Sequence, residues 1–211
     1  MVRIAGKAKW IEAKRIYARK LVQSQIRIGR SQVHGIEVDQ VVAEETFGTI
    51  DELISVMGFA RSICENAEVR NRTKAIQREL FAVSSVIATG SGKKPGKGKE
   101  PPAVTKEMVE ALTADVHEAE KIEGLLADWV LPGEHAAAAA FDIARTTCRR
   151  AERQVVRLGE AGEKAPADVL AYLNRLSDLL WLFGRRLEKD AGVDGALRDS
   201  KKPGSGWSRA W

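Results

Sequence analysis

Cysteine and histidine are scarce in this chain of 211 residues, and aromatic residues make up only 6% of it. The two cysteines, Cys64 and Cys148, form no C-x-x-C pair, and the three histidines are scattered along the chain. A disulfide framework and a Cys/His zinc site both need several such residues at close spacing. The sequence therefore predicts neither, and it predicts a cytoplasmic protein without a metal site of its own.

Long apolar runs are lacking as well. The longest uncharged apolar run, Ala136–Phe141, is far shorter than the roughly 20 residues of a membrane-spanning helix. The opening MVRIAGKAKW has no apolar signal core. With 44% hydrophobic and 30% charged residues, the chain can bury one sizeable core. We expect one domain that stays in water and has no membrane partner.

Positive charge gathers near the ends of the chain and in one internal segment. Residues 1–36, 90–102 and 201–211 together hold 16 of the 34 Lys and Arg residues but 2 of the 29 Asp and Glu residues. The remainder carries 18 cations and 27 acids, so the formal charge of +5 reflects a basic fringe on an acidic body. Without a zinc-finger or RNP-type motif, this pattern argues against nucleic-acid binding and favours solubilising termini.

Helical patterns dominate, and signals for β-strands are nearly absent. GSGKKPGKGKEPP at 90–102 is typical of a flexible linker, and KKPGSGWSRAW at 201–211 of a mobile tail. We expect an all-α protein with a basic N-terminal segment at 1–36, a helical domain at 37–190 and a C-terminal tail at 191–211. Apolar spacing predicts helices at about 47–66, 68–89, 104–128, 134–159 and 166–190.

The first predicted helix carries a possible binding stripe. Thr49-Ile50-Asp51-Glu52 matches a T-x-x-E capping box, which predicts a helix start and puts Asp51 in the first turn, where the helix dipole favours a carboxylate. Asp51 also begins a stripe of small residues with Ser55, Gly58 and Ser62, opposite the apolar stripe Ile50, Leu53, Met57 and Ala60. The pattern favours a capped, solvated helix end. The alternative is that a neighbouring helix or ligand brings a cation to Asp51.

The fourth predicted helix contains the run ARTTCRRAER at 144–153, in which four arginines face Glu152 as their one counter-charge. Arg145 and Glu152 lie at the edge of the predicted core stripe, and Arg149 lies just outside it. Arg150 and Arg153 lie farther round. The core stripe itself consists of Phe141, Ala144, Cys148, Ala151, Val155 and Leu158.

Arginines at the margin of a buried stripe are partly desolvated and require an anionic partner. Two guanidinium forks one turn apart suit a polyphosphate better than a single carboxylate. The alternatives are a solvated basic face or internal ion pairs, for example between Arg149 and Glu152. The pattern alone leaves these interpretations open.

The fifth predicted helix is apolar on more than one face. Trp181 projects on the side opposite the core stripe, one heptad after Asn174 and near Ser177 and Asp178. A tryptophan is out of place on a solvent-facing side, so this second face predicts contact with another subunit or a ligand. The core stripe consists of Val169, Tyr172, Leu173, Leu176, Leu180 and Phe183.

Four segments carry a family resemblance. They are WVLPGEHAAAAAFDIARTTCRRAER at 129–153, VLAYLNRLSDLLWLFGRR at 169–186, EETFGTIDELISVMGFAR at 44–61 and IQRELFAVSSVIAT at 76–89. In this order they resemble the PduO-type ATP:cob(I)alamin adenosyltransferases. The resemblance implies a five-helix bundle that assembles as a homotrimer, with ATP, carried with Mg²⁺, and cobalamin bound at each subunit junction. The implied reaction is displacement at the ATP 5′-carbon by cobalt(I), which forms adenosylcobalamin and releases triphosphate.

The resemblance also implies roles for single residues. By position, Arg149 would hold ATP phosphate, and Arg145 would pair with Asp51 across a subunit interface. Glu152 and Asn174 would complete the nucleotide pocket. The triphosphate leaving group accumulates negative charge as the bond breaks, which accounts for the cluster of arginines. Further candidates for contact with ATP or the corrinoid are Arg150, Tyr17 and Arg19.

Trp129 falls where the family typically has a phenylalanine that blocks the lower face of the corrin, leaving a four-coordinate cobalt that is easier to reduce. The alternative is a packing residue ahead of the Pro132 turn. The implied further partners are a flavoprotein reductase or an adenosylcobalamin-dependent enzyme.

The chain departs from the family where the family binds triphosphate. The family reads K-I-Y-T-R-T-G-D-x-G-x-T, whereas here Arg15–Arg19 is followed by Lys20–Gln25 without either glycine or the aspartate. Glycines there let backbone N–H groups wrap phosphate oxygens. The family's L-P-G-G has also become Leu131–Glu134, and its D-E-L-N has become Asp51–Ile54. A non-catalytic relative that binds a corrinoid, a nucleotide or a protein partner as a trimeric sensor, carrier or scaffold is therefore the alternative to a working transferase.

Overall fold

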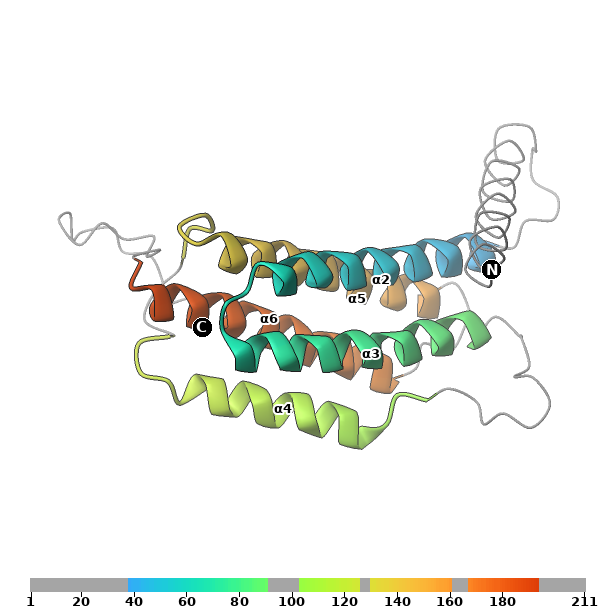
Figure 1. Cartoon of the computed structure of the whole chain (residues 1–211). Coiled ribbons are helices and arrows are strands. Elements are labelled where there is room, and N and C mark those ends of the chain that lie inside the picture. Colours follow the sequence, from blue (N-terminus) through green and yellow to red (C-terminus); the bar gives the residue numbers. More distant parts are fainter. Residues whose placement is uncertain (1–37, 91–102, 126–129, 161–166, 194–211) are drawn as a thin grey trace, which may run out of the picture. The chain divides into compact units, whose positions relative to one another are not determined.

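The computed structural model describes residues 38–90, 103–125, 130–160 and 167–193. Its regular elements are the α-helices α2 (Val38–Ser62), α3 (Ala67–Gly90), α4 (Lys106–Glu120), α5 (Ala136–Glu160) and α6 (Ala167–Ala191). The helices run lengthwise beside one another (Figure 1). The predicted all-α fold is confirmed. None of the described helices is both long enough and apolar enough to cross a membrane.

The start of α2 differs from the prediction. The helix begins at Val38, so Thr49 lies inside it and donates its hydroxyl to the carbonyl oxygen of Glu45 at 2.8 Å instead of capping a helix end. Residues 38–48 contain no proline and only Gly48, at the end of the segment, so nothing stops a helix from entering the capping-box sequence. Asp51 is therefore not in a first turn, and the helix dipole does not account for it.

The other helices lie close to their predicted ranges except at the end of α4. This helix is capped by the Thr105 hydroxyl, which accepts from the Met108 N–H, and it ends at Glu120 instead of near 128. Gly124 follows with a φ of 84°, a left-handed conformation that glycine adopts without strain and that a continuous helix does not contain.

Packing places the described helices side by side in the order α3, α2, α5, α6 and α4. Helix α2 packs against α3 and α5, and α6 packs against α5 and α4. The predicted core stripes of α2, α5 and α6 are all buried, with Ile50, Leu53, Phe141, Cys148 and Leu173 completely so. Each stripe points inward because its apolar residues recur with the period of the helix.

A polar network joins α3 to α4 and α6. Arg72 on α3 contacts Asp115 on α4 at 2.5 Å and Glu79 on its own helix at 2.9 Å. Glu79 also accepts a hydrogen bond of 2.7 Å from the hydroxyl of Tyr172 on α6, whose ring is buried. Burial, together with the negative charge of Glu79, raises the pKa of the Tyr172 hydroxyl, so this group remains a donor.

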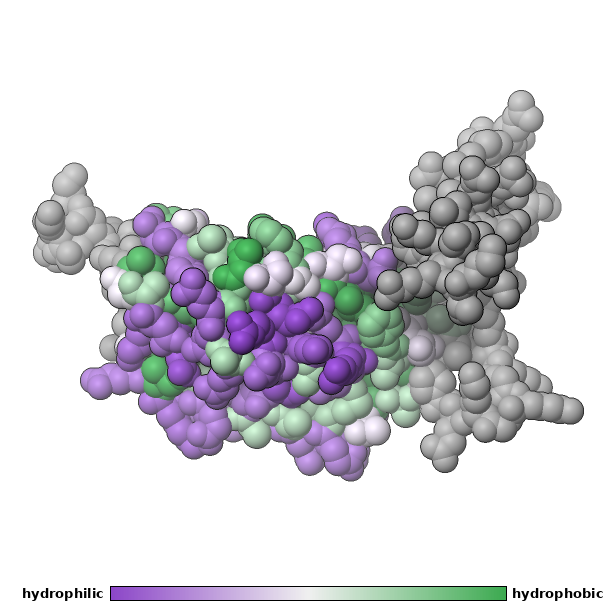
Figure 2. Space-filling view, viewed as in Figure 1, coloured by the Kyte–Doolittle hydropathy of each residue, from purple (hydrophilic) through white to green (hydrophobic). Residues whose placement is uncertain are grey.

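The exposed surface of α3 is polar along the first half of the helix. Arg70, Lys74 and Arg78 are exposed there, and Figure 2 shows hydrophilic side chains gathered over this part of the helix. Toward the end of α3 the surface is more hydrophobic, and Phe81 is 62% exposed. The face of α3 shown is thus polar at one end only.

Candidate functional site

The basic run lies in the middle and second half of α5, which begins beyond the turn at Gly133. Gly133 has a φ of 141°, and His135 accepts the Ala138 N–H at its ring nitrogen Nδ1 across 3.3 Å. Ala138 and Ala140 are buried, so the alanine run packs closely against the bundle. This packing fixes the rotation of α5 and thereby sets which side of the helix each arginine occupies.

Arg145 lies at the edge of the buried stripe, as predicted. Its side chain is 31% exposed, and its Nε atom lies 3.6 Å from Oδ1 of Asp142. That distance is too long for a hydrogen bond. Nε is buried and has no hydrogen-bond partner among the described residues. Arg145 is thus held at its inner side by the charge of Asp142 alone and has hydrogen-bonding capacity to spare.

Arg149 and Arg150 have different surroundings. Arg149 is exposed and forms no ion pair with any residue that the structure describes. Arg150 pairs with Glu52 on α2. The internal Arg149–Glu152 pair that the sequence left open does not form, and Glu152 instead accepts a hydrogen bond from another helix. Arg149 therefore remains available to an external anion.

That hydrogen bond joins the two motifs of the predicted nucleotide pocket. Asn174 on α6 donates its side-chain amide to Oε1 of Glu152 at 3.1 Å. Ser177 donates its hydroxyl to the backbone carbonyl of Asn174 at 2.8 Å. Two predicted site residues that are far apart in the sequence thus lie in contact.

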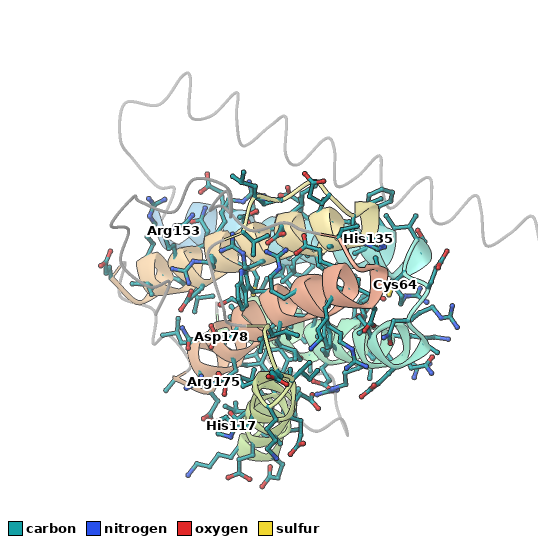
Figure 3. The ribbon with its side chains drawn as sticks, turned by 90° about the vertical axis from the view of Figure 1, so that its left-hand side faces the viewer. Cys64, His117, His135, Arg153, Arg175 and Asp178 are labelled. Carbon is teal, nitrogen blue, oxygen red and sulfur yellow. The ribbon has the colours of Figure 1, made fainter. Side chains whose placement is uncertain are left out.

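Asp178 lies one turn after Asn174 on α6 and is an acidic group close to this contact. It lies 3.1 Å from Nη1 of Arg175, and Figure 3 shows the two residues close together. Desolvation raises the pKa of the Asp178 carboxyl, although the positive charges of Arg175 and Arg149 oppose that effect. Arg149 and Asp178 thus interact electrostatically without forming an ion pair.

Trp181 is partly covered within one subunit, and its predicted contact with another subunit or a ligand stays a prediction. Trp181 is half-buried and packs against the core, and the Arg185 guanidinium lies 5.4 Å from the centre of its ring. A cation over the ring face, together with the core contacts, accounts for much of this aromatic surface within one subunit. The position of Trp181 therefore gives less support to a second subunit than its sequence pattern did.

Asp51 lies exposed on α2 and forms no ion pair with the described residues. The small-residue stripe that it begins is partly explained within the chain. A Cβ atom added at Gly58 would lie 3.2 Å from Nε2 of Gln77 on α3. Gln77 in turn donates to the Ile54 carbonyl at 2.9 Å and accepts from Arg61 at 2.9 Å. At Gly58 the close neighbour is thus α3, whereas the Asp51 end of the stripe is open.

Sequence reasoning missed a buried charged group next to Arg145. Asp142 on α5 contacts Arg185 on α6 at 2.7 Å, and Arg185 also contacts Glu188 at 3.1 Å. A signal was present, since Asp142 is the one charged residue of AAAAAFDIA and precedes Arg145 by three positions. The pairing of Asp142 with Arg185 could not be read from the local pattern, because Arg185 lies on another helix.

Cys148, in the middle of the basic run, is a packing residue. Its thiol is buried and donates to the Leu173 carbonyl at 3.2 Å. Burial strongly raises the pKa of the Cys148 thiol, so the nucleophilic thiolate does not form near neutral pH. The functional groups of the run are therefore its arginines and Glu152.

Several predicted site residues lie outside the described residues, namely Tyr17, Arg19, Lys20–Gln25 and Trp129. In the described ranges, no three His, Cys, Asp or Glu residues are grouped so that they could hold a metal ion. His117 on α4 and His135 before α5 are well separated in Figure 3.

Comparison with known proteins places the chain in a family. The sequence model of a family described as Cobalamin adenosyltransferase matches residues 39–187. The chain is 33% identical over 159 residues to the corrinoid adenosyltransferase PduO of Salmonella typhimurium, covering 75% of this chain and 46% of that protein. It is 34% identical over 154 residues to a corrinoid adenosyltransferase of Bacillus subtilis, covering 71% of this chain and 76% of that protein. The match thus spans less than half of the first relative and about three quarters of the second.

Solved structures agree with this assignment. A variant PduO-type ATP:corrinoid adenosyltransferase from Lactobacillus reuteri, complexed with ATP, superposes with a TM-score of 0.66 at 27% identity, covering 80% of this chain and 92% of that one. A second variant of that enzyme, complexed with cobalamin and ATP, gives a TM-score of 0.65 over 81% of this chain and 91% of that one. The family model, the relatives and these structures agree, and the chain belongs to the cobalamin adenosyltransferase family.

Proposed function

We propose that this chain transfers the 5′-deoxyadenosyl group of ATP to the cobalt of cob(I)alamin. Cobalt(I) donates an electron pair to the 5′-carbon, and the bond between that carbon and the triphosphate oxygen breaks. The products are adenosylcobalamin and triphosphate. The related structures from Lactobacillus reuteri hold ATP, and one of them also holds cobalamin.

The observation that carries the proposal is the state of two arginines one turn apart on α5. Arg149 has no ion-pair partner among the described residues, and the Nε of Arg145 is buried without a hydrogen bond there. Guanidinium groups bind phosphate oxygens in a fixed fork. Arg149 would hold the phosphates of ATP and stabilise the charge that develops on the leaving triphosphate.

Neighbouring residues would complete the nucleotide pocket. Asn174 and Glu152 hold each other in place and present polar groups from two helices beside Arg149. Arg150 is a weaker candidate for a ligand contact, since Glu52 already offsets its charge. Mg²⁺ would arrive with ATP and bind mainly through phosphate oxygens and water, as it does in many nucleotide sites.

The proposed assembly is a homotrimer in the cytoplasm, with sites at the subunit junctions. Asp51 is exposed and lacks an ion-pair partner among the described residues of its own chain, which supports a contact with Arg145 of a second copy.

Tyr17 and Arg19 would approach the phosphates, and Trp129 would cover the lower face of the corrin. Because cobalt(I) must be regenerated by reduction, a flavoprotein reductase is the proposed supplier, and an adenosylcobalamin-dependent enzyme is the proposed consumer.

Titration calorimetry tests the proposal. The purified protein, titrated separately with ATP and with cobalamin, is expected to bind both. Binding of neither ligand would contradict both a transferase and a ligand-binding relative.

Trp129→Ala is expected to abolish the four-coordinate cobalt spectrum of bound cobalamin, and an unchanged spectrum would make Trp129 a packing residue only.

One observation favours a second candidate function. Lys20–Gln25 lacks the two glycines and the aspartate with which the family wraps triphosphate. A family member with a retired active site would bind ligand as a sensor, carrier or scaffold. Grafting T-G-D-x-G-x-T into this stretch separates the two. A transferase with a weakened loop gains ATP affinity and transfer rate together, because the loop acts on both bound and departing phosphate. A retired site gains no transfer.

A further inference from the structure

A buried group of four charged side chains lies between α5 and α6. The side chains of Asp142, Arg185 and Glu188 are 7%, 3% and 6% exposed, and Arg145 is the fourth member at their edge. Nη2 of Arg185 donates to Oδ2 of Asp142 at 2.7 Å and to Oε1 of Glu188 at 3.2 Å. Buried charges are costly unless they are paired, and here two acids offset two arginines.

The helices approach closely at this group, which limits the freedom of the Asp142 carboxylate. A Cβ atom added at Gly184 on α6 would lie 3.4 Å from the Ala138 carbonyl oxygen and 3.8 Å from Oδ2 of Asp142. Arg185 is held further by the ring of Trp181, 5.4 Å away. The carboxylate of Asp142 is therefore fixed by packing as well as by hydrogen bonding.

Asp142 divides its two oxygens between two arginines. Oδ2 accepts from Arg185, whereas Oδ1 faces Nε of Arg145 at 3.6 Å. Nε is the inner nitrogen of the Arg145 guanidinium. The two terminal nitrogens make no hydrogen bond to any residue within the described ranges. An arginine held at its inner side presents its outer side in a defined direction.

We propose that Asp142, held by Arg185, is a positioning residue that directs Arg145 toward an oxyanion in the site. The proposal rests on the proposed function of the chain. The oxyanion is either a phosphate oxygen of ATP or the carboxylate of Asp51 on a second copy. Asp142 touches neither substrate and acts through Arg145.

Asp142→Asn tests this role because it is nearly isosteric and keeps one acceptor. The amide oxygen satisfies Arg185, and the NH2 group then faces Arg145, where a donor meets a donor. Glu188→Gln is the matched control, since it removes a carboxylate from the same buried group without touching Arg145. Both variants lose one buried negative charge.

We expect Asp142→Asn to act on Arg145 and Glu188→Gln not to do so. Asp142→Asn should weaken ATP binding or trimer assembly by at least about tenfold, the loss expected when a hydrogen bond to a charged group is not made. Weaker ATP binding with an intact trimer identifies phosphate as the oxyanion, and dissociation of the trimer identifies Asp51. In an Arg145→Ala background the Asp142→Asn effect should vanish. Equal effects of the two variants, or an unchanged effect in that background, would overturn the proposal.

A second measurement uses the unmodified protein and does not depend on ATP binding. Solvent exchange of the Arg145 Nε proton, assigned by its loss in Arg145→Lys, is expected to be much slower than exchange at exposed Arg153. Equal exchange rates would overturn the proposal even if the chain is an active transferase. Slow exchange in a protein that binds no ATP would instead retain the positioning of Arg145 and reject the proposed function.

Discussion

The side-chain amide of Asn174 on α6 donates a 3.1 Å hydrogen bond to Glu152 on α5. This contact joins the run ARTTCRRAER to the run YLNRLSDLL and fixes polar groups from both beside Arg149. Because each helix is also anchored by a buried apolar stripe, the contact is held by the bundle and not by a loop.

The first prediction concerns Arg149. Arg149→Ala should weaken ATP binding by roughly 1.5–3 kcal/mol, the scale of a hydrogen bond to a charged group. Calorimetry measures the loss, and circular dichroism checks that the helices remain. Arg153→Ala is the control, since Arg153 is an exposed cation on the same helix. An unchanged affinity in Arg149→Ala, or an equal loss in the control, would show that these arginines form only a solvated basic face.

The second prediction concerns assembly. The protein should sediment as a trimer, and Asp51→Ala should raise the concentration at which the trimer dissociates, because it removes the proposed partner of Arg145. Glu45→Ala changes the charge equally at another exposed position of α2 and should have little effect. A monomer at micromolar concentration would contradict the proposed assembly. A trimer that is insensitive to Asp51→Ala would contradict only the proposed ion pair.

The third prediction concerns the network that joins α3, α4 and α6. Tyr172→Phe removes the hydrogen bond to Glu79 and should lower the free energy of unfolding by roughly 1.5–3 kcal/mol, because the acceptor is charged. Urea unfolding measures this change, and the m-value should stay constant if both states remain equally compact. A stability equal to that of the unmodified protein would show that Arg72 alone satisfies Glu79.

The fourth prediction follows from the pKa of Asp178, which desolvation raises above its ordinary value of 3.8. The folded protein binds this proton more readily than the unfolded chain, so the carboxyl makes stability fall as pH rises through its folded pKa. Asp178→Asn should therefore be more stable than the unmodified protein at neutral pH, and the difference should shrink as pH falls toward 3.8. Urea unfolding at several pH values measures it. Lower stability of the variant at neutral pH would mean that the Arg175 pair outweighs desolvation.

Local periodicity was enough to predict most of the fold. The stripes containing Leu53, Phe141 and Leu173 were assigned correctly because burial of apolar residues follows the helical period. The start of α2 was missed because the capping-box pattern around Thr49 also occurs inside a helix when no residue breaks the preceding turns.

The candidate site was predictable only where its residues carry motifs. Glu152 and Asn174 were identified from the family resemblance, and the structure brings them together. Asp142 was not identified, because its partner Arg185 lies on another helix and their contact depends on how the two helices pack. The contact of Arg185 with the ring of Trp181 was open to prediction, because the two residues lie four positions apart on the same helix, where side chains are neighbours.

Anaerobic mixing of the purified protein with ATP and reduced cobalamin tests the central claim most directly. The absorbance of cob(I)alamin should give way to that of adenosylcobalamin, with one triphosphate released for each adenosyl group transferred. Omission of the protein supplies the control for spontaneous reaction. Absence of transfer, although ATP and cobalamin both bind, would contradict the claim that this chain is a working adenosyltransferase and would leave a ligand-binding relative on the same fold.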